Sequence, residues 1–403
     1  MTSASCGGEQ DACAVSPPLN NLPRRSASGL RHTVGKIVPC QGRHHLLGRG
    51  ESMSATLPTT RSWRLLVFVL LAVAGLFYVK WLPYYGRAFV AANQHSIGHS
   101  ILMGDAASAP APSWNAALGY ALAYGKAIWQ AMLLGLLLGS GIQALLPVDW
   151  VQRMLGQRHF GSVLAGGLLA VPGMMCTCCA AQVVVGLREH RASPGAAVAF
   201  WLGNTVLNPA TLVFTGFVLG WHWTALRLLL GIPMVFGLGY VANRMAGPGE
   251  PAAPVAWSPT AAEPRSPAEV GRRWARIFGR MTLRLIPEYI VIVLLLGAVR
   301  AWMFPHVSPA MGDQWFWIVA LALAGMLFVI PTAGEVPIVQ AMLALGLGGG
   351  PAAALLLTLP PVSLPSLAML GRSFPWRMLV VIAFAVVGFG ILGGALAVLL
   401  GLH

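Results

Sequence analysis

Long apolar segments recur along most of this chain, and they constrain its fold more than any other feature. Each is near or above the ~20 residues that an α-helix needs to cross a bilayer. Only 9% of the 403 residues are charged, whereas a soluble domain carries roughly 25%. The sequence therefore predicts an all-α integral membrane protein, a polytopic helical bundle of about nine spans. The segments are Leu65–Val79 and roughly 117–146, 161–187, 194–219, 223–242, 283–304, 315–346, 350–370 and 376–401.

The apolar segments and the polar stretches between them predict six parts of the chain. The first part lacks apolar periodicity and is rich in Arg, Ser, Gly and Pro, which is typical of disorder. We hypothesise that translation starts at Met53, within this part, and that residues 1–52 are not translated. Lys80 stands close to the end of the first apolar helix, where we expect its side chain to snorkel to the interface. The parts are a disordered basic tail (1–60), an N-terminal membrane anchor (61–82), a connection (83–116), a first repeat (117–242), a linker (243–282) and a second repeat (283–403).

Two groups of four apolar segments look like copies of each other. At an offset of 156 residues, Pro209 falls on Pro365 and Cys179 falls on Glu335. The second and third segments of each group are also interrupted by Pro or Gly. Paired interruptions in corresponding positions of two halves are typical of transporters and mark their binding sites. We therefore predict two homologous four-span repeats with interrupted helices. The expected helix breaks are Pro172, Gly173, Pro209, Pro331, Pro337 and Pro365.

Basic residues give two signals about orientation that disagree. The tail and the linker are both rich in Arg, and the positive-inside rule puts such stretches in the cytoplasm. Five full crossings between them would place them on opposite sides of the membrane. Either one interrupted segment is re-entrant or one of the two charge signals misleads, so the orientation stays open.

The net charge of +14 raises the question of nucleic-acid binding. Much of the excess lies in the first 64 residues and in 243–284, and basic loops beside apolar spans are expected from membrane orientation. We therefore expect no nucleic-acid partner. The sequence also has no phosphate-binding Gly loop with Lys, no His-Glu-x-x-His helix and no plausible catalytic triad. We expect neither enzymatic activity nor a cofactor.

A cluster of sulfur atoms is the most informative local feature. Residues 174–179 carry five sulfurs in six positions, directly after Pro172 and Gly173. If the helix unwinds there, the thiols of Cys176, Cys178 and Cys179 can converge. Such ligands prefer soft ions, including monovalent copper and, by the same logic, trivalent arsenic or antimony. We predict that these three cysteines bind a thiophilic metal or metalloid. The alternative is that Cys and Met only fill space in a packed bundle.

Four polar residues inside apolar sequence are further candidates. Glu335 is predicted to couple transport to protons, because ionisable residues within spans by default mark a substrate or proton path. Its alternative is a carboxylate at a loop end that reaches interfacial water. Asn204, Asn208 and Gln182 either bind substrate or satisfy the backbone that Pro209 leaves unpaired.

The stretch Pro172–Gly220 resembles the predicted permease family that includes the ArsP-type organoarsenical efflux permeases. The matching elements are the Cys176-Thr177-Cys178 run and Asn204 through Asn208-Pro209. The second half looks like that family's second repeat, so the resemblance covers about 117–401. The chain departs from the family where Cys179 and Gln182 replace Gly and a later Pro, and where 332–334 lack a cysteine. The resemblance implies a multi-pass permease of the bacterial inner membrane with duplicated architecture. Characterised relatives transport a trivalent methylated arsenical.

These observations together predict a permease that exports a thiophilic metal or metalloid species by alternating access. Its expected partners are the lipid bilayer and the small substrate, and a homo-oligomer is left open. The export direction follows from the toxicity of such substrates rather than from any residue. Other readings are a permease for another small solute, a membrane-embedded thiol redox protein that uses Cys176 and Cys179, and a scaffold without transport.

Overall fold

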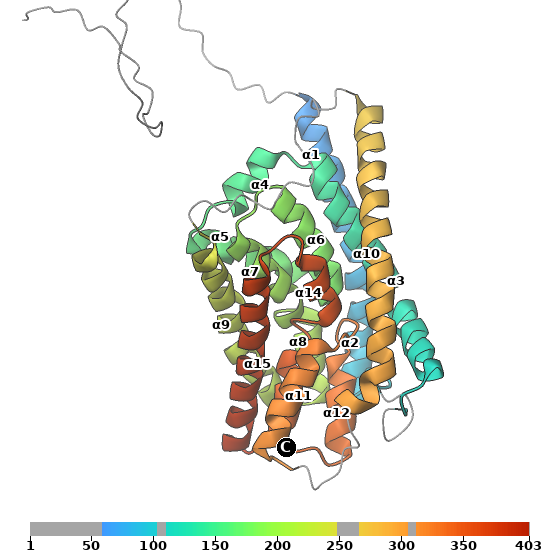
Figure 1. Ribbon diagram of the computed structural model, residues 1–403, viewed down its shortest axis with the longest axis vertical. Coiled ribbons are helices and arrows are strands. Elements are labelled where there is room, and N and C mark those ends of the chain that lie inside the picture. Colours follow the sequence, from blue (N-terminus) through green and yellow to red (C-terminus); the bar gives the residue numbers. More distant parts are fainter. Residues whose placement is uncertain (1–58, 103–109, 248–265, 305–311, 403) are drawn as a thin grey trace, which may run out of the picture. The chain divides into compact units, whose positions relative to one another are not determined.

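The computed structural model describes residues 59–102, 110–247, 266–304 and 312–402. The predicted tail, 1–60, therefore lies almost wholly outside the described residues. Every regular element in the described part is a helix (Figure 1). Six of these helical segments are long and apolar enough to span a membrane, and shorter apolar helices accompany them. The chain is thus a polytopic helical membrane protein.

The N-terminal helix is longer than the predicted anchor. Helix α1 (Thr59–Leu76) continues through a π-helical turn, η1 (Phe77–Trp81), into α2 (Leu82–Gln94) without leaving the helical region of backbone space. The first part of the predicted connection is therefore helical. The large apolar side chains of this helix are mostly exposed, which suits a helix that faces lipid.

The segment 161–187 folds back on itself. It contains α5 (Phe160–Ala170), a short 3-10 turn η2 (Val171–Gly173) and α6 (Thr177–Glu189). The start of α5 lies beside the end of α6, because Ser162 Oγ is 3.3 Å from Ser193 Oγ. The backbone N–H of Ser193 also donates to the carbonyl of Leu155, just before α5, at 2.7 Å. The segment enters and leaves at one end of the bundle, so it is a hairpin rather than a crossing.

The segment 315–346 forms a second hairpin from the opposite end. It contains α11 (Trp315–Leu327) and α12 (Glu335–Ala344), joined by an irregular stretch. Asp313, before α11, accepts a hydrogen bond from the backbone N–H of Gly350, after α12, at 2.8 Å. Figure 1 shows α11 and α12 away from the end where α5 and α6 begin and finish. Both hairpins are thus re-entrant, which is one of the alternatives that the sequence left open for an interrupted segment. Neither of them counts as a full crossing.

Two further helices cross with a break near their middle. Helix α7 (Pro194–Val206) gives way to α8 (Pro209–Val218), and α13 (Gly349–Thr358) gives way to α14 (Leu364–Leu370). Uninterrupted helices frame these broken ones: α3 (Trp114–Leu145), α9 (Trp221–Met245), α10 (Pro267–Met303) and α15 (Trp376–Leu399), with the short α4 (Val148–Leu155) at one end.

The order of elements from α3 to α9 recurs from α10 to α15. In each series a long helix is followed by a hairpin, a broken helix and a final long helix. The contacts between the series are reciprocal, since α6 packs against α14 and α8 packs against α12, while α3 packs against α10 and α9 against α15. This arrangement is the one expected of duplicated halves, and the homology of the two repeats stays a prediction.

Helix α10 begins inside the predicted linker. Ser266 and Glu269 form a capping box, in which each side chain binds the other residue's backbone N–H. Pro267 at the first helical position adds to the start signal. The Arg-rich stretch that follows is therefore the polar first part of a helix, and the non-helical part of the linker is shorter than 243–282.

Candidate functional site

The break in the first hairpin places the sulfur cluster at a helix start. After η2, Met174 adopts a left-handed backbone conformation with φ of 45°, which is uncommon for a residue other than glycine. Gly173 is pressed against Asn204, and a Cβ there would lie 2.2 Å from Asn204 Oδ1. Cys176 is the N-cap of α6. Irregular backbone at this depth is tolerated because it is buried within protein.

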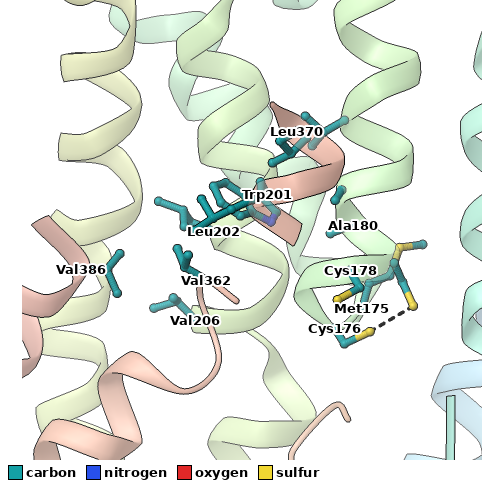
Figure 2. Packing of buried hydrophobic residues seen from close by; sticks show 14 of the residues in the cluster. Met175, Cys176, Cys178, Ala180, Trp201, Leu202, Val206, Val362, Leu370 and Val386 are labelled. Atoms are coloured by element: carbon teal, nitrogen blue, oxygen red, sulfur yellow. Dashed lines mark hydrogen bonds between the residues drawn. The ribbon is translucent and has the colours of Figure 1, made fainter. Parts of the chain in front are cut away.

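The three thiols do not converge on one point. Cys176 Sγ lies 3.0 Å from Cys179 Sγ, whereas Cys178 Sγ lies 3.7 Å from Ser363 Oγ. The dashed line from Cys176 in Figure 2 marks the first contact, and the sulfur of Cys178 points away from it. The helix resumes at Thr177, so the N-cap residue Cys176 and the third helical residue Cys179 share a face of α6. The side chain of Cys178 is rotated away from Cys179 by about 100° around the helix axis.

This geometry corrects the expectation of a three-thiol metal site. Within the part of the chain that the structure describes, no group of three or more His, Cys, Asp or Glu residues is arranged to hold a metal ion. What the fold provides is a pair, Cys176 and Cys179, both buried and both reduced.

The predicted amide residues have different positions. Asn204 Oδ1 accepts from the backbone N–H of Met175 at 3.4 Å, so Asn204 supports the broken backbone. Asn208 caps α8 through its Oδ1, while its buried Nδ2 finds no hydrogen-bond partner among the described residues. Gln182 packs against Gly135 of α3, and its buried Oε1 has no partner there either. Of the three, Asn208 faces the pocket described next.

A narrow pocket lies where the helix breaks meet. The first hairpin contributes Met175–Thr177, the α7–α8 break contributes Thr205 and Asn208, and the second hairpin contributes Glu335 and the stretch 330–333. The empty space amounts to about 210 Å³ including its open side. The pocket therefore draws its walls from both series of helices.

The proline positions show how these breaks are built. Pro172 lies in η2 and Pro331 in the irregular tip of the second hairpin. Pro209 is the first residue of α8, Pro365 the second residue of α14 and Pro337 the third residue of α12. Proline is well tolerated in the first helical turn because the N–H that it lacks has no partner within the helix there.

Glu335 is held by a buried ion pair that the sequence reading missed. Its Oε1 lies 2.8 Å from Nη1 of Arg227, and both side chains are at most 2% exposed. Arg227, on α9, also donates to the carbonyls of Val206 and Thr205 at 3.2 and 2.7 Å. Those carbonyls close helix α7, and the break at Asn208 leaves them without helical partners. An arginine inside the apolar stretch 223–242 was the signal that marks this role.

Lys80 is buried rather than snorkelling. It lies in η1, where it is 3% exposed, and its Nζ donates to Thr332 Oγ1 at 3.0 Å. Its ammonium also lies 5.6 Å from the ring centroid of Tyr84. The helix continues to Gln94, so Lys80 stands in mid-helix and not at the end of a span. Thr332 lines the pocket, and the N-terminal helix thereby reaches the site.

Two tyrosines of α3 satisfy the irregular tip of the second hairpin. Tyr120 donates to the carbonyl of Val329, and Tyr124 donates to the carbonyl of Ile330. Both tyrosines are buried. Free carbonyls at this depth need such partners because no water is available within the hydrocarbon region.

Comparison with known proteins gives the chain its class. Residues 113–399 match a family described as predicted permease. The chain is 48% identical over 359 residues to the UPF0718 protein YraQ of Escherichia coli (strain K12), a match that covers 87% of this chain and 99% of that protein. No solved structure matches the chain. Together with the apolar helices, these matches identify a multi-pass protein of the bacterial inner membrane. The chain belongs to the predicted permease family that includes the ArsP-type permeases.

Proposed function

We propose that this permease exports a small thiophilic species, of the trivalent organoarsenical type, by alternating access. The observation that carries the proposal is the Cys176–Cys179 pair at a helix break, beside a pocket whose walls come from both series of helices. Soft metalloids bind thiols in preference to oxygen or nitrogen ligands. A site between two such units can be exposed first to one side and then to the other.

The number of available thiols favours an organic derivative over a bare ion. A trivalent metalloid that carries one organic group has two positions left for sulfur. Each thiol replaces one hydroxide, which leaves as water with the thiol's proton. One R–M(OH)₂ and two thiols therefore give one R–M(S)₂ unit and two waters. The 3.0 Å separation of Cys176 Sγ and Cys179 Sγ suits chelation of a single centre.

The polar lining supplies the remaining roles in the proposal. The free amide of Asn208 donates to substrate oxygen within the pocket. Glu335 couples transport to protons, because its protonation would neutralise the carboxylate that holds Arg227. Loss of that ion pair weakens a contact between α12 and α9, and it frees the two series to move against each other.

A resistance and accumulation panel in a sensitive host tests the proposal. The compounds are methylarsenite, antimonite, copper and silver, and the variants are Cys176→Ser, Cys179→Ser and Glu335→Gln. Cys178→Ser is the matched control, because Cys178 lies in the same turn but points to Ser363. We expect the first two serine variants to lose protection against methylarsenite and the control to keep most of it. Equal protection by all serine variants against every compound would exclude the thiol site.

The short sulfur–sulfur distance also favours a second candidate, a membrane-embedded thiol redox protein. Cys176 and Cys179 have the C-x-x-C spacing at a helix start that is typical of thiol redox proteins. This function needs an electron partner and a disulfide that forms and is reduced again. Mild oxidation followed by thiol counting distinguishes the candidates. A disulfide that cycles in living cells without any effect of the compounds supports the redox protein and contradicts the export proposal.

A further inference from the structure

The N-terminal helix is hydrogen-bonded to the tips of both hairpins. Trp81 Nε1 donates to the carbonyl of Pro172, in the tip of the first hairpin, at 3.1 Å. Lys80 Nζ donates to Thr332 Oγ1, in the tip of the second hairpin, at 3.0 Å. The hydroxyl of Tyr84 also donates to the carbonyl of Thr332 at 3.5 Å. Two consecutive residues of one helix thus bind two loop tips that enter from opposite ends of the bundle.

These hydrogen bonds are hard to replace within a membrane. The turn η2 ends at Gly173, so the carbonyl of Pro172 has no partner further along a helix. Within the hydrocarbon region neither lipid nor bulk water can satisfy such a group. Lys80 and Trp81 lie in η1, and π-helical turns inside longer helices are frequent at functional sites. Neighbouring residues of a helix point roughly 100° apart, so one turn can reach two separate tips.

Both tips have a strained backbone, and the N-terminal helix packs against the strained residues. Met174 in the first tip and Ala333 in the second have left-handed φ values of 45° and 64°. Residues other than glycine keep such conformations only where their surroundings hold them. Met174 and Ala333 belong to one small apolar cluster that also contains Ala91 of α2, and Tyr84 and Ala88 pack against it. Helix α2 therefore supports both tips by packing as well as by hydrogen bonds.

A helix that only anchors the chain does not need this arrangement. An anchor needs an apolar surface of sufficient length, whereas Lys80 is a charged residue in mid-helix that is 3% exposed. Ionisable residues within spans by default mark functional parts of a membrane protein. Its partner Thr332 lines the pocket, and so does Met175, three residues after Pro172. The helix therefore acts on the segments that form the site.

We propose that the N-terminal helix is a working part of the permease, in which Trp81 and Lys80 are positioning residues. Trp81 fixes the tip 171–176 at the pocket, and Lys80 fixes the tip 328–334. Neither residue needs to touch substrate, because each acts through the tip that it binds. The inference rests on the proposed function only in treating the pocket as the substrate site. It assigns a role to a helix that lies before residues 113–399, the part matched by the family.

Hydrogen–deuterium exchange of the full-length protein in detergent tests the proposal without any substrate. Each tip contains a hydrogen-bonded amide whose protection reports local opening. In the first tip the N–H of Met175 donates to Asn204 Oδ1 at 3.4 Å. In the second tip the N–H of Gly334 donates to the carbonyl of Pro331 at 2.9 Å. Peptides that cover 171–176 and 328–334 therefore report on the two tips separately.

The variants are chosen to release one tip at a time. Trp81→Phe keeps an aromatic ring but loses the N–H. It should speed exchange in 171–176 about fivefold, as expected for one lost hydrogen bond, and leave 328–334 unchanged. Lys80→Met should do the reverse, while Lys80→Arg, which keeps a donor, should leave both tips protected. Tyr84→Phe removes only a hydroxyl and should give a smaller rise, confined to 328–334.

Two matched controls replace exposed residues of α3. Trp114→Phe and Lys126→Met should change exchange at neither tip. Unchanged exchange at the bonded tip in either Trp81→Phe or Lys80→Met would overturn the proposal. An equal rise at both tips and throughout the long helices would overturn it too, because general loosening is what a merely structural role predicts. Since no substrate enters this measurement, a failed resistance panel with tip-selective exchange intact would count against the proposed function alone.

Discussion

At the scale of single residues, Arg227 connects the two series of helices. Its guanidinium takes the carbonyls that end α7 and, at the same time, the carboxylate that begins α12. A planar group with five donors can serve all of these acceptors at once, which a lysine cannot. The charge of Glu335 at a helix N-terminus is also favoured by the helix dipole. One side chain thus stabilises a helix break and an ion pair between distant elements.

Replacing either residue of this ion pair alone should be more harmful to stability than replacing both together. Glu335→Gln leaves Arg227 buried without a carboxylate, and Arg227→Met leaves Glu335 and two carbonyls unpaired. Each should reduce the free energy of unfolding by about 3–5 kcal/mol. The double variant should lose clearly less than the sum of the two single losses. Denaturant unfolding in detergent, read as a double-mutant cycle, measures this coupling, and simple additivity would contradict it.

A buried histidine predicts acid sensitivity. His190 lies in the turn after α6, and burial lowers its pKa to about 4, a trend opposed by a hydrogen bond to the Leu146 backbone and supported by Arg273. The folded state keeps this ring neutral, whereas the unfolded chain protonates it near its ordinary value of 6.5. The contribution of His190 to the free energy of unfolding should therefore be fully favourable above pH 6.5 and should be lost as the pH drops toward 4.

The measurement for His190 is the melting temperature in detergent at pH 7, 6, 5 and 4. We expect His190→Gln to lose less stability over this range than the parent protein. His159→Gln serves as a control, because His159 is an exposed N-cap residue of α5. Parallel curves for His190→Gln and the parent would show that the ring does not carry the acid sensitivity.

At the scale of elements, the positions of helix breaks could be predicted and the path of the chain through them could not. Asn208-Pro209 and Pro172-Gly173 act on their own backbone, so a local pattern shows them. A hairpin and a broken crossing have the same composition. What separates them is contact between residues far apart, such as Asp313 with Gly350 at 2.8 Å. The expected meeting of three thiols failed for a local reason, because the helix resumes at Thr177.

Close packing between α3 and α6 depends on small residues and gives an element-scale prediction. A Cβ on Gly139 would lie 2.4 Å from the carbonyl oxygen of Gln182 on α6, so Gly139→Ala should push the two helices apart. Gly125→Ala on the same helix meets nothing within 4 Å and should be tolerated. We expect a fall in melting temperature and in folded yield for the first variant only. Equal melting temperatures would show that the helices do not need this contact.

At the scale of the whole described unit, positive charge gathers at the end from which the first hairpin enters. Helix α1 starts there, because Phe68 lies against Gly141 near the end of α3. Few basic residues, such as Arg87 and Arg300, lie toward the other end. The residues at the charged end are Arg64, Arg153, Arg158, Arg188, Arg191, Arg244, Arg272, Arg273, Arg276, Arg280, Arg372 and Arg377.

The hairpins remove the conflict between the two charge signals. With the first hairpin returning to its own side, the N-terminal helix, α3, α7–α8 and α9 bring the linker back to the side of the start of α1. By the positive-inside rule we predict that this side is the cytoplasm and that the C-terminal end of α15 is periplasmic. Alkaline phosphatase fused after residue 402 should be active, and the same enzyme placed in 248–265 should be inactive. The reverse pattern would invert the orientation.

The site as a whole could be predicted only in part. Cys176, Asn208 and Glu335 carry local signs of function and do meet at one pocket. The partners of Lys80 and Arg227 could not be predicted, because they lie 252 and 108 residues away along the chain. No local pattern encodes such a pairing. A lysine near an apparent span end also reads as snorkelling until the true length of its helix is known.

The two opposed hairpins affect how much protein separates the aqueous compartments on the two sides of the membrane. Because one hairpin enters from each end, we expect the seal between the compartments to depend on two loop tips, 171–176 and 328–334, rather than on the full length of a helix. On this expectation, a displacement of either tip would open a route on that side. We expect the gates to be these short tips, which open on one side or the other as the two series of helices move against each other.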